Sequence, residues 1–161
     1  MRQSCNSVGI IDDTIILGFE NIILVLKEKD LTILNRIDGK YNKLLIVPER
    51  KLFLRIEIIQ NATFAFPKPQ MFNSQETKIY TRAGNNSYIA SKAIKSGIDF
   101  ACPSKDQDCL IVISNQKLAI LNIKSGEILD FPNTNGMIAC GYSPDLITVF
   151  GISSSKITIY H

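Results

Sequence analysis

The chain has 161 residues, of which 45% are hydrophobic and 20% charged, a balance typical of a globular protein and too apolar for a disordered one. Its formal net charge of +3 is far from the dense Lys/Arg stripe of a dedicated nucleic-acid-binding domain. The length predicts a single domain over residues 1–161 with its own core.

The N-terminal segment, MRQSCNSVGIIDD, lacks the unbroken apolar run that a signal peptide requires. The most apolar stretch, residues 14–26, is interrupted by Glu20 and Asn21 and is shorter than the roughly 20 residues of a membrane helix. We therefore expect an intracellular protein, cytoplasmic or nuclear, that has no membrane partner.

Short apolar segments alternate along the chain with Gly, Asn, Asp, Ser and Pro, which is typical of strands and turns. Residues 67–76 contain Pro67 and Pro69 and show no periodicity, so we expect an exposed loop insertion there. The expected strands lie near 8–11, 14–19, 22–27, 31–35, 44–47, 51–58, 62–66, 77–81, 87–93, 98–102, 109–114, 117–123, 127–131, 137–142, 146–152 and 156–160.

One phrase occurs twice, as DLTILNRIDGK at 30–40 and as KLAILNIKSGE at 117–127, with an offset of 87 residues. A second match places SNQKLAILN at 114–122 over SSSKITIYH at 153–161, with an offset of 39. The unit is therefore about forty residues long, and 87 is close to two units. Four copies result, one of them divergent and beginning at residue 43.

A period of about forty residues with three or four short strands per unit is typical of a β-propeller blade. The segment IACGYSPDLITVFGISSSKITIYH at 138–161 resembles the WD-repeat family, with Tyr160-His161 in the place of the Trp-Asp pair. In residues 117–131, Leu121-Asn122 would occupy that place. The sequence has no Trp and no Gly-His pair, so these would be degenerate blades without the family's polar network.

A rival resemblance, to the citron-homology type of propeller, is carried by LLIVPERKLFL at 44–54. Both resemblances imply an all-β, β-propeller-like fold of about four blades of short antiparallel strands, either a complete small ring or part of a larger one. If a small ring closes, the strand at 8–11 is expected beside the strand at 156–160. The repeats further predict that Ile33, Ile120 and Ile159 occupy equivalent strands.

The WD-repeat resemblance implies a non-enzymatic protein-interaction scaffold, a subunit of a larger assembly, with no cofactor. An open set of blades would expose apolar end faces too large for a soluble monomer to leave bare, so we expect protein partners or self-association to cover them. The residues expected on these faces are Ile15, Leu17, Phe19, Val149, Ile157 and Ile159.

The alternative function is a nucleic-acid-associated subunit, for example of a ribonucleoprotein complex. Two clusters of basic residues with aromatic neighbours favour it, since they could bind a phosphate backbone. Solvated charges at the rim are the competing interpretation. The residues of this basic surface would be Arg36, Lys40, Lys43, Arg50, Lys51 and Arg55.

Catalytic and metal-binding patterns are weak. Asp12-Asp13 is read as a turn, because adjacent residues on a strand point to opposite faces and cannot form a carboxylate pair. His161 is the only histidine and the last residue, a poor position for an oriented catalytic imidazole. The four cysteines form no CxxC pair, so they predict buried thiols and no zinc site.

Overall fold

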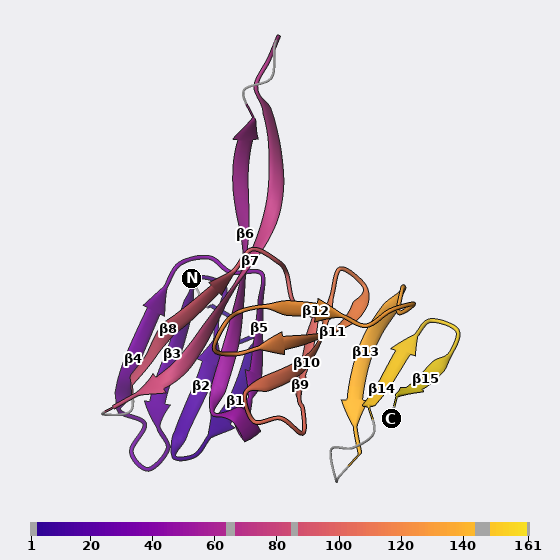
Figure 1. The fold of residues 1–161 in the computed structure, drawn as a ribbon. Helices are drawn as coiled ribbons and strands as arrows, with labels where there is room; N and C mark the ends of the chain where they lie inside the picture. Colours follow the sequence, from indigo (N-terminus) through magenta and orange to yellow (C-terminus); the bar gives the residue numbers. More distant parts are fainter. Residues whose placement is uncertain (1–2, 64–66, 85–86, 144–148, 161) are drawn as a thin grey trace.

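The computed structural model describes residues 3–63, 67–84, 87–143 and 149–160. They form four antiparallel sheets, each a simple meander, that follow one another in a row (Figure 1). We call these sheets blades 1 to 4. The described residues contain no helix long and apolar enough to span a membrane.

Blades 1 and 2 form the N-terminal half. Blade 1 consists of β1 (Ser7–Ile11), β2 (Thr14–Gly18), β3 (Ile22–Lys27) and β4 (Ile33–Asp38). Blade 2 consists of β5 (Lys43–Val47), β6 (Leu52–Thr63), β7 (Gln70–Ala83) and β8 (Ser87–Ile94), with the 3-10 turn η1 (Pro48–Arg50) after β5.

Blades 3 and 4 form the C-terminal half. Blade 3 consists of β9 (Phe100–Pro103), β10 (Cys109–Ser114), β11 (Lys117–Asn122) and β12 (Ile128–Asp130). Blade 4 has three strands, β13 (Met137–Tyr142), β14 (Val149–Ser153) and β15 (Ile157–Tyr160). The Ser-Pro-Asp turn expected after Tyr142 and the terminal His161 lie largely outside the described residues.

The first strands of consecutive blades, β1, β5, β9 and β13, contact one another in order, so they line the inner edge of the row. Blades pack face to face through apolar side chains. The clusters are centred on Phe53 between blades 1 and 2, on Leu54 and Leu110 between blades 2 and 3, and on Ile113 and Met137 between blades 3 and 4. Each fully buried Ile, Leu or Phe contributes about 1.5–3 kcal/mol, so the junctions between blades hold the fold together.

The expected loop at 67–76 requires correction. β6 and β7 stay paired from Leu52–Thr81 out to Thr63–Gln70, so residues 70–76 are strand and not loop. The two expected strands at 51–58 and 62–66 merge into one β6 as far as Thr63. The segment is nonetheless largely exposed, because this hairpin extends well beyond the rest of blade 2 (Figure 1).

The offset of 39 residues is confirmed, since it maps β10 onto β14 and β11 onto β15. The offset of 87 is misleading, because Ile33 lies in the fourth strand of blade 1 whereas Ile120 lies in the third strand of blade 3. The shared phrase describes a strand followed by a glycine at positive φ, Gly39 at +115° and Gly126 at +75°. Such a turn can follow any strand, so the phrase recurs without marking equivalent positions.

The row does not close on itself. β1 pairs with β2 as the innermost strand of blade 1, and β15 pairs with β14. The pairing of 8–11 beside 156–160, which was expected if a small ring closes, is therefore not formed among the described residues. Blades 1 and 4 lie at opposite ends of the row (Figure 1). Each therefore has one face without a neighbouring blade in this chain.

Candidate functional site

Every blade has two faces, because successive side chains on a strand point to opposite sides of the sheet. We call the face toward the next blade in the sequence the forward face and the face toward the preceding blade the backward face. Each junction within the chain is a forward face packed on a backward face. Among the described residues, the forward face of blade 4 and the backward face of blade 1 have no such partner.

The junction between blades 3 and 4 shows what a covered pair of faces contains. The forward face of blade 3 supplies Ile111, Ile113, Leu118 and Ile120, together with Cys102. The backward face of blade 4 supplies Met137, Cys140, Tyr142, Val149 and Tyr160. Ile113 and Leu118 are completely buried there, and the only polar groups among these residues are thiols and the two tyrosine hydroxyls.

The forward face of blade 4 repeats this pattern without a partner. Adding 39 to the four aliphatic positions of the blade 3 face gives Phe150, Ile152, Ile157 and Ile159, which share one face of β14 and β15 by their register. Ile157 is 67% exposed and Ile159 is 53% exposed. Positions that seal one blade against the next are therefore apolar and bare at this end.

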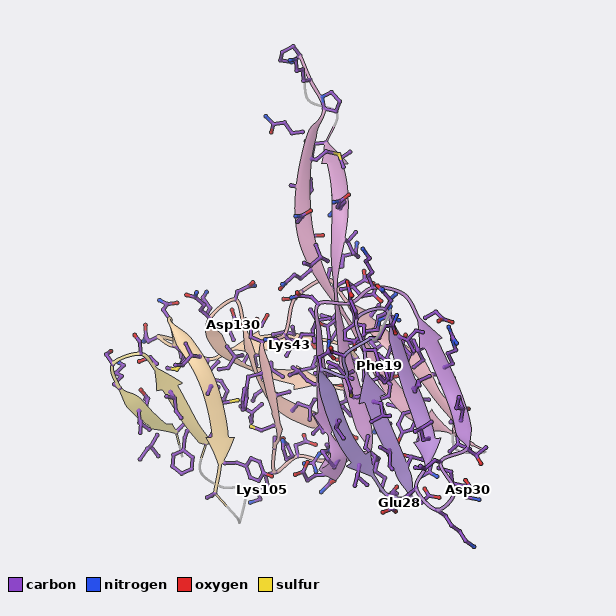
Figure 2. The ribbon with its side chains drawn as sticks, turned by 180° about the vertical axis from the view of Figure 1, so that it is seen from behind. Phe19, Glu28, Asp30, Lys43, Lys105 and Asp130 are labelled. Carbon is purple, nitrogen blue, oxygen red and sulfur yellow. The ribbon has the colours of Figure 1, made fainter. Side chains whose placement is uncertain are left out.

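The backward face of blade 1 is bare in the same way. By register, Val8 pairs with Leu17 and Ile10 with Ile15, and Leu24 and Leu26 of β3 continue the same face. Val8 is 66% exposed, whereas Ile16 and Ile23 on the opposite face are completely buried against blade 2. Figure 2 shows the two ends of this blade, with Phe19 near one end and Glu28 and Asp30 at the other.

Most residues predicted for the end faces lie where the sequence placed them. Ile15 and Leu17 belong to the bare face of blade 1, Ile157 and Ile159 belong to that of blade 4, and Phe19 lies half-buried just beyond β2. Val149 requires correction, because it pairs with Tyr142 and packs with the cluster between blades 3 and 4.

The end faces also contain several residues that were not expected there. Alternation with period two was the available signal, since Val8 and Ile10 are apolar at alternate positions of the strand at 8–11. That strand was expected to close a small ring and not to form an end face. The missed residues are Val8, Ile10, Leu24, Leu26, Phe150 and Ile152.

The total solvent-accessible area of the chain agrees with exposed apolar faces at both ends of the row. The solvent-accessible area is 9792 Å², whereas a compact chain of 18.0 kDa exposes about 8,000 Å². The excess is about a fifth of the expected value, and open ends of the row and an extended hairpin both expose more surface than a compact chain does. Within β1, β2, β14 and β15 there is no charged residue, so no charge lies at the centre of either end face. On blade 1, Arg36 shares the face at its outer edge, where it pairs with Leu24.

The six basic residues do not form one surface. Lys43 and Arg50 lie at opposite ends of the five-residue strand β5, about 17 Å apart along its length. Arg55 is 5% exposed, and its guanidinium donates to the carbonyl oxygens of Asp38 and Lys40 and pairs with Glu57 at 2.9 Å. A buried, paired guanidinium cannot reach a phosphate backbone.

Acidic or carbonyl partners also occupy most of the other basic residues. Lys43 donates to the carbonyl oxygen of Asp99, and Arg50 donates to those of Ser104 and Asp106. Arg36 pairs with Asp38 at 2.9 Å and Lys51 with Asp12 at 3.2 Å. These contacts occupy donor groups that a phosphate-binding surface would need free.

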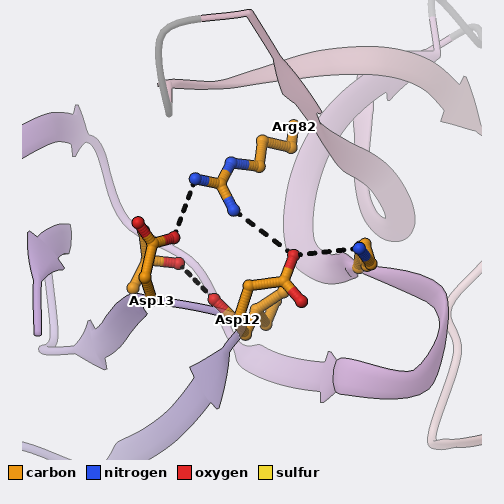
Figure 3. Close-up of polar contacts among 6 residues, drawn as sticks. Asp12, Asp13 and Arg82 are labelled. Atoms are coloured by element: carbon orange, nitrogen blue, oxygen red, sulfur yellow. Dashed lines mark hydrogen bonds and ion pairs between the residues drawn. The ribbon is translucent and has the colours of Figure 1, made fainter.

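Asp12 and Asp13 form the turn between β1 and β2, as expected, and Asp12 has a positive φ of 52°. Figure 3 shows their partner: Arg82 of β7 approaches both carboxylates, at 3.3 Å from Asp12 and 2.8 Å from Asp13. The hydrogen bond from Arg82 lowers the pKa of Asp13. The two acids thus tie blade 1 to blade 2 and do not form a catalytic pair.

An open hollow of about 370 Å³ lies where β5, β9 and β13 meet. Glu49 of η1 and Tyr142 at the end of β13 both line it, and the Tyr142 hydroxyl lies 3.5 Å from Glu49 Oε1. Desolvation and the nearby Glu49 carboxylate raise the pKa of Tyr142. Within the part of the chain that the structure describes, no three His, Cys, Asp or Glu side chains are grouped to hold a metal ion.

Comparison with known proteins supports the fold. Over 98% of its length the chain superposes on the β-propeller domain of Myceliophteria thermophila Cps50 (Swd1), with a TM-score of 0.67 and 8% sequence identity. It also superposes over its whole length on the computationally designed Ika4 protein, covering 92% of that chain with a TM-score of 0.62 and 12% identity. No family model and no curated protein matches the sequence.

The fold is therefore that of a β-propeller, with four blades in an open row. The chain spans about half of the Cps50 (Swd1) propeller domain, 54% of its length. At identities this low the likeness concerns the fold alone.

Proposed function

We propose that this chain is a non-enzymatic protein-interaction scaffold of the WD-repeat-like type, whose two end faces bind protein. One observation carries the proposal: the positions that seal blade 3 against blade 4 recur 39 residues later as an apolar face that no other described blade covers. Burying such a face is strongly favourable. Scaffolding by a propeller also agrees with the likeness to the Cps50 (Swd1) propeller domain.

We place this role inside the cell, where the four cysteines, all unbonded, would remain reduced. The end faces are aliphatic and uncharged at their centres, which suits a protein surface and gives a phosphate backbone nothing to bind. The partner therefore presents an apolar patch with a polar rim.

Site-specific photo-crosslinking tests the proposal. A photoreactive side chain at Ile157, on the bare face of blade 4, should form covalent products with protein in living cells. The same group at Leu129, which is 69% exposed on the outer strand of blade 3, should form few. Equal yields at the two positions, or none at Ile157, would contradict a protein-binding end face.

A further inference from the structure

We infer that the partner is a second copy of this chain, and that two copies close an eight-bladed ring by packing the forward face of blade 4 of each copy on the backward face of blade 1 of the other. This inference rests on the proposed function and names its partner.

The junctions between blades within one chain already show which faces fit together. All three contacts between blades in this chain join a forward face to a backward face. The row ends with one unsatisfied face of each kind, Phe150, Ile152, Ile157 and Ile159 at blade 4 and Val8, Ile10, Ile15 and Leu17 at blade 1. A second copy carries both complementary faces, whereas an unrelated protein would have to supply each of them separately.

The number of blades in one chain suits a ring made of two copies. Head-to-tail contacts between identical chains produce a ring when repeating the rotation from one chain to the next returns to the first chain, and an open filament when it does not. Propellers contain four to eight blades, so two rows of four blades reach the upper limit and close by a two-fold axis. The chain does not close alone, since blades 1 and 4 lie at opposite ends of the row (Figure 1).

The amino-acid composition of the two end faces suits a stable interface. The strands that would meet at the new junction, β1 and β2 of one copy and β14 and β15 of the other, contain no charged residue. The charged groups of blade 1 lie at its periphery, as Arg36 and Asp38 do on the outer strand β4, where they pair at 2.9 Å. An uncharged centre with a charged rim is the usual anatomy of a stable interface.

The test measures the mass of the full chain in solution by analytical ultracentrifugation. The wild-type chain should sediment at twice the 18.0 kDa mass of one chain. Placing two lysines on either end face, Val8→Lys with Ile10→Lys or Ile157→Lys with Ile159→Lys, should weaken the dimer by at least about 100-fold. Leu129→Lys is the matched control, since Leu129 is as exposed but lies on neither end face, and it should remain dimeric.

A mixing experiment then identifies which faces meet. The blade 1 variant keeps an intact blade 4 face, and the blade 4 variant keeps an intact blade 1 face. Mixing the two monomeric variants should therefore restore a dimer containing one chain of each, held by one good junction. Circular dichroism of each variant alone verifies that it is folded, so that loss of the dimer is not loss of the fold.

Five outcomes would overturn the inference. A blade 4 variant that stays dimeric would show that the blade 1 faces of two copies pair with each other. A blade 1 variant that stays dimeric would show that the blade 4 faces of two copies pair with each other. A wild-type mass above two chains would indicate an open filament. A wild-type monomer that binds an apolar dye would exclude self-association yet leave the proposed function standing, whereas a monomer that binds no dye would contradict both.

Discussion

The Sγ atoms of Cys102 and Cys140 lie 3.6 Å apart, across the junction between β9 of blade 3 and β13 of blade 4. Both thiols are buried. The hydrogen bond that Cys140 shares with Cys102 lowers the pKa of Cys102, and the same bond, with burial, raises that of Cys140. Cys102 is therefore the thiolate that would react first.

We predict that a thiol oxidant such as diamide joins these two cysteines. The bond would close a loop between residues 38 positions apart, which stabilises the folded state by about 4 kcal/mol and raises the melting temperature by about 10 °C. Peptide mapping should find the Cys102–Cys140 link, and Cys140→Ser should lose both the link and the stabilisation. Oxidised protein in which Cys102 and Cys140 both remain free thiols would contradict the prediction.

The second prediction concerns Phe53, which is completely buried and stacks on Tyr80 with ring centroids 5.0 Å apart. Phe53→Ala removes the centre of the cluster between blades 1 and 2 and should lower the free energy of unfolding by about 3–5 kcal/mol. Phe72→Ala, on the hairpin extension and 49% exposed, should change it by less than about 0.5 kcal/mol. Urea unfolding of the two variants measures the difference, and equal losses would contradict the assignment of the core.

Much of the architecture could be predicted because strands and turns have local signatures. The strand-rich pattern follows from alternation and from the residues that form turns, and the 39-residue offset joins equivalent strands of blades 3 and 4. The number of four units agrees with the four sheets, although the offset of 87 that helped to give it does not join equivalent strands. The equivalence of Ile33 and Ile120 failed because the repeated phrase encodes a strand with a glycine turn, Gly39 or Gly126, and not a place in the blade.

The site was harder to predict because burial depends on contacts distant in sequence. Arg55 looks like a surface charge, yet the fold buries it beside Glu57 and the carbonyl oxygens of the β4–β5 connection. Val149 is apolar like its neighbour Phe150, and only the pairing register decides which of the two faces blade 3. A shift of one residue in register exchanges the two faces of a strand.

The third prediction concerns acid. Arg82 holds the pKa of Asp13 below its ordinary value of 3.8, so the folded state binds this proton less readily than the unfolded state does. The stabilisation is complete above 3.8 and is lost as the pH falls through the lowered folded-state pKa. Asp13→Asn should therefore be less stable than the wild type near neutral pH, and the difference should shrink in acid. Urea unfolding across pH measures it, and a difference that grows in acid would contradict the assignment.

The last prediction concerns the hairpin extension of β6 and β7. Ile58 and Gln75 pair across the hairpin, so residues 59–74 can be replaced by Asn-Gly, which forms a tight two-residue turn between paired strands. Among the removed residues, those that the structure describes, 59–63 and 67–74, supply none of the three buried clusters, so the melting temperature should fall by no more than a few degrees.

The matched control for this truncation lies on the same strand. Ile79 of β7 is completely buried between blades 2 and 3, so Ile79→Ala should cost about 2–5 kcal/mol although it removes far fewer atoms. Thermal unfolding of the two variants compares them directly. Because stability resides at the junctions between blades, the small buried change should destabilise the protein more than the large exposed one, and the opposite order would show that the extension is part of the folded core.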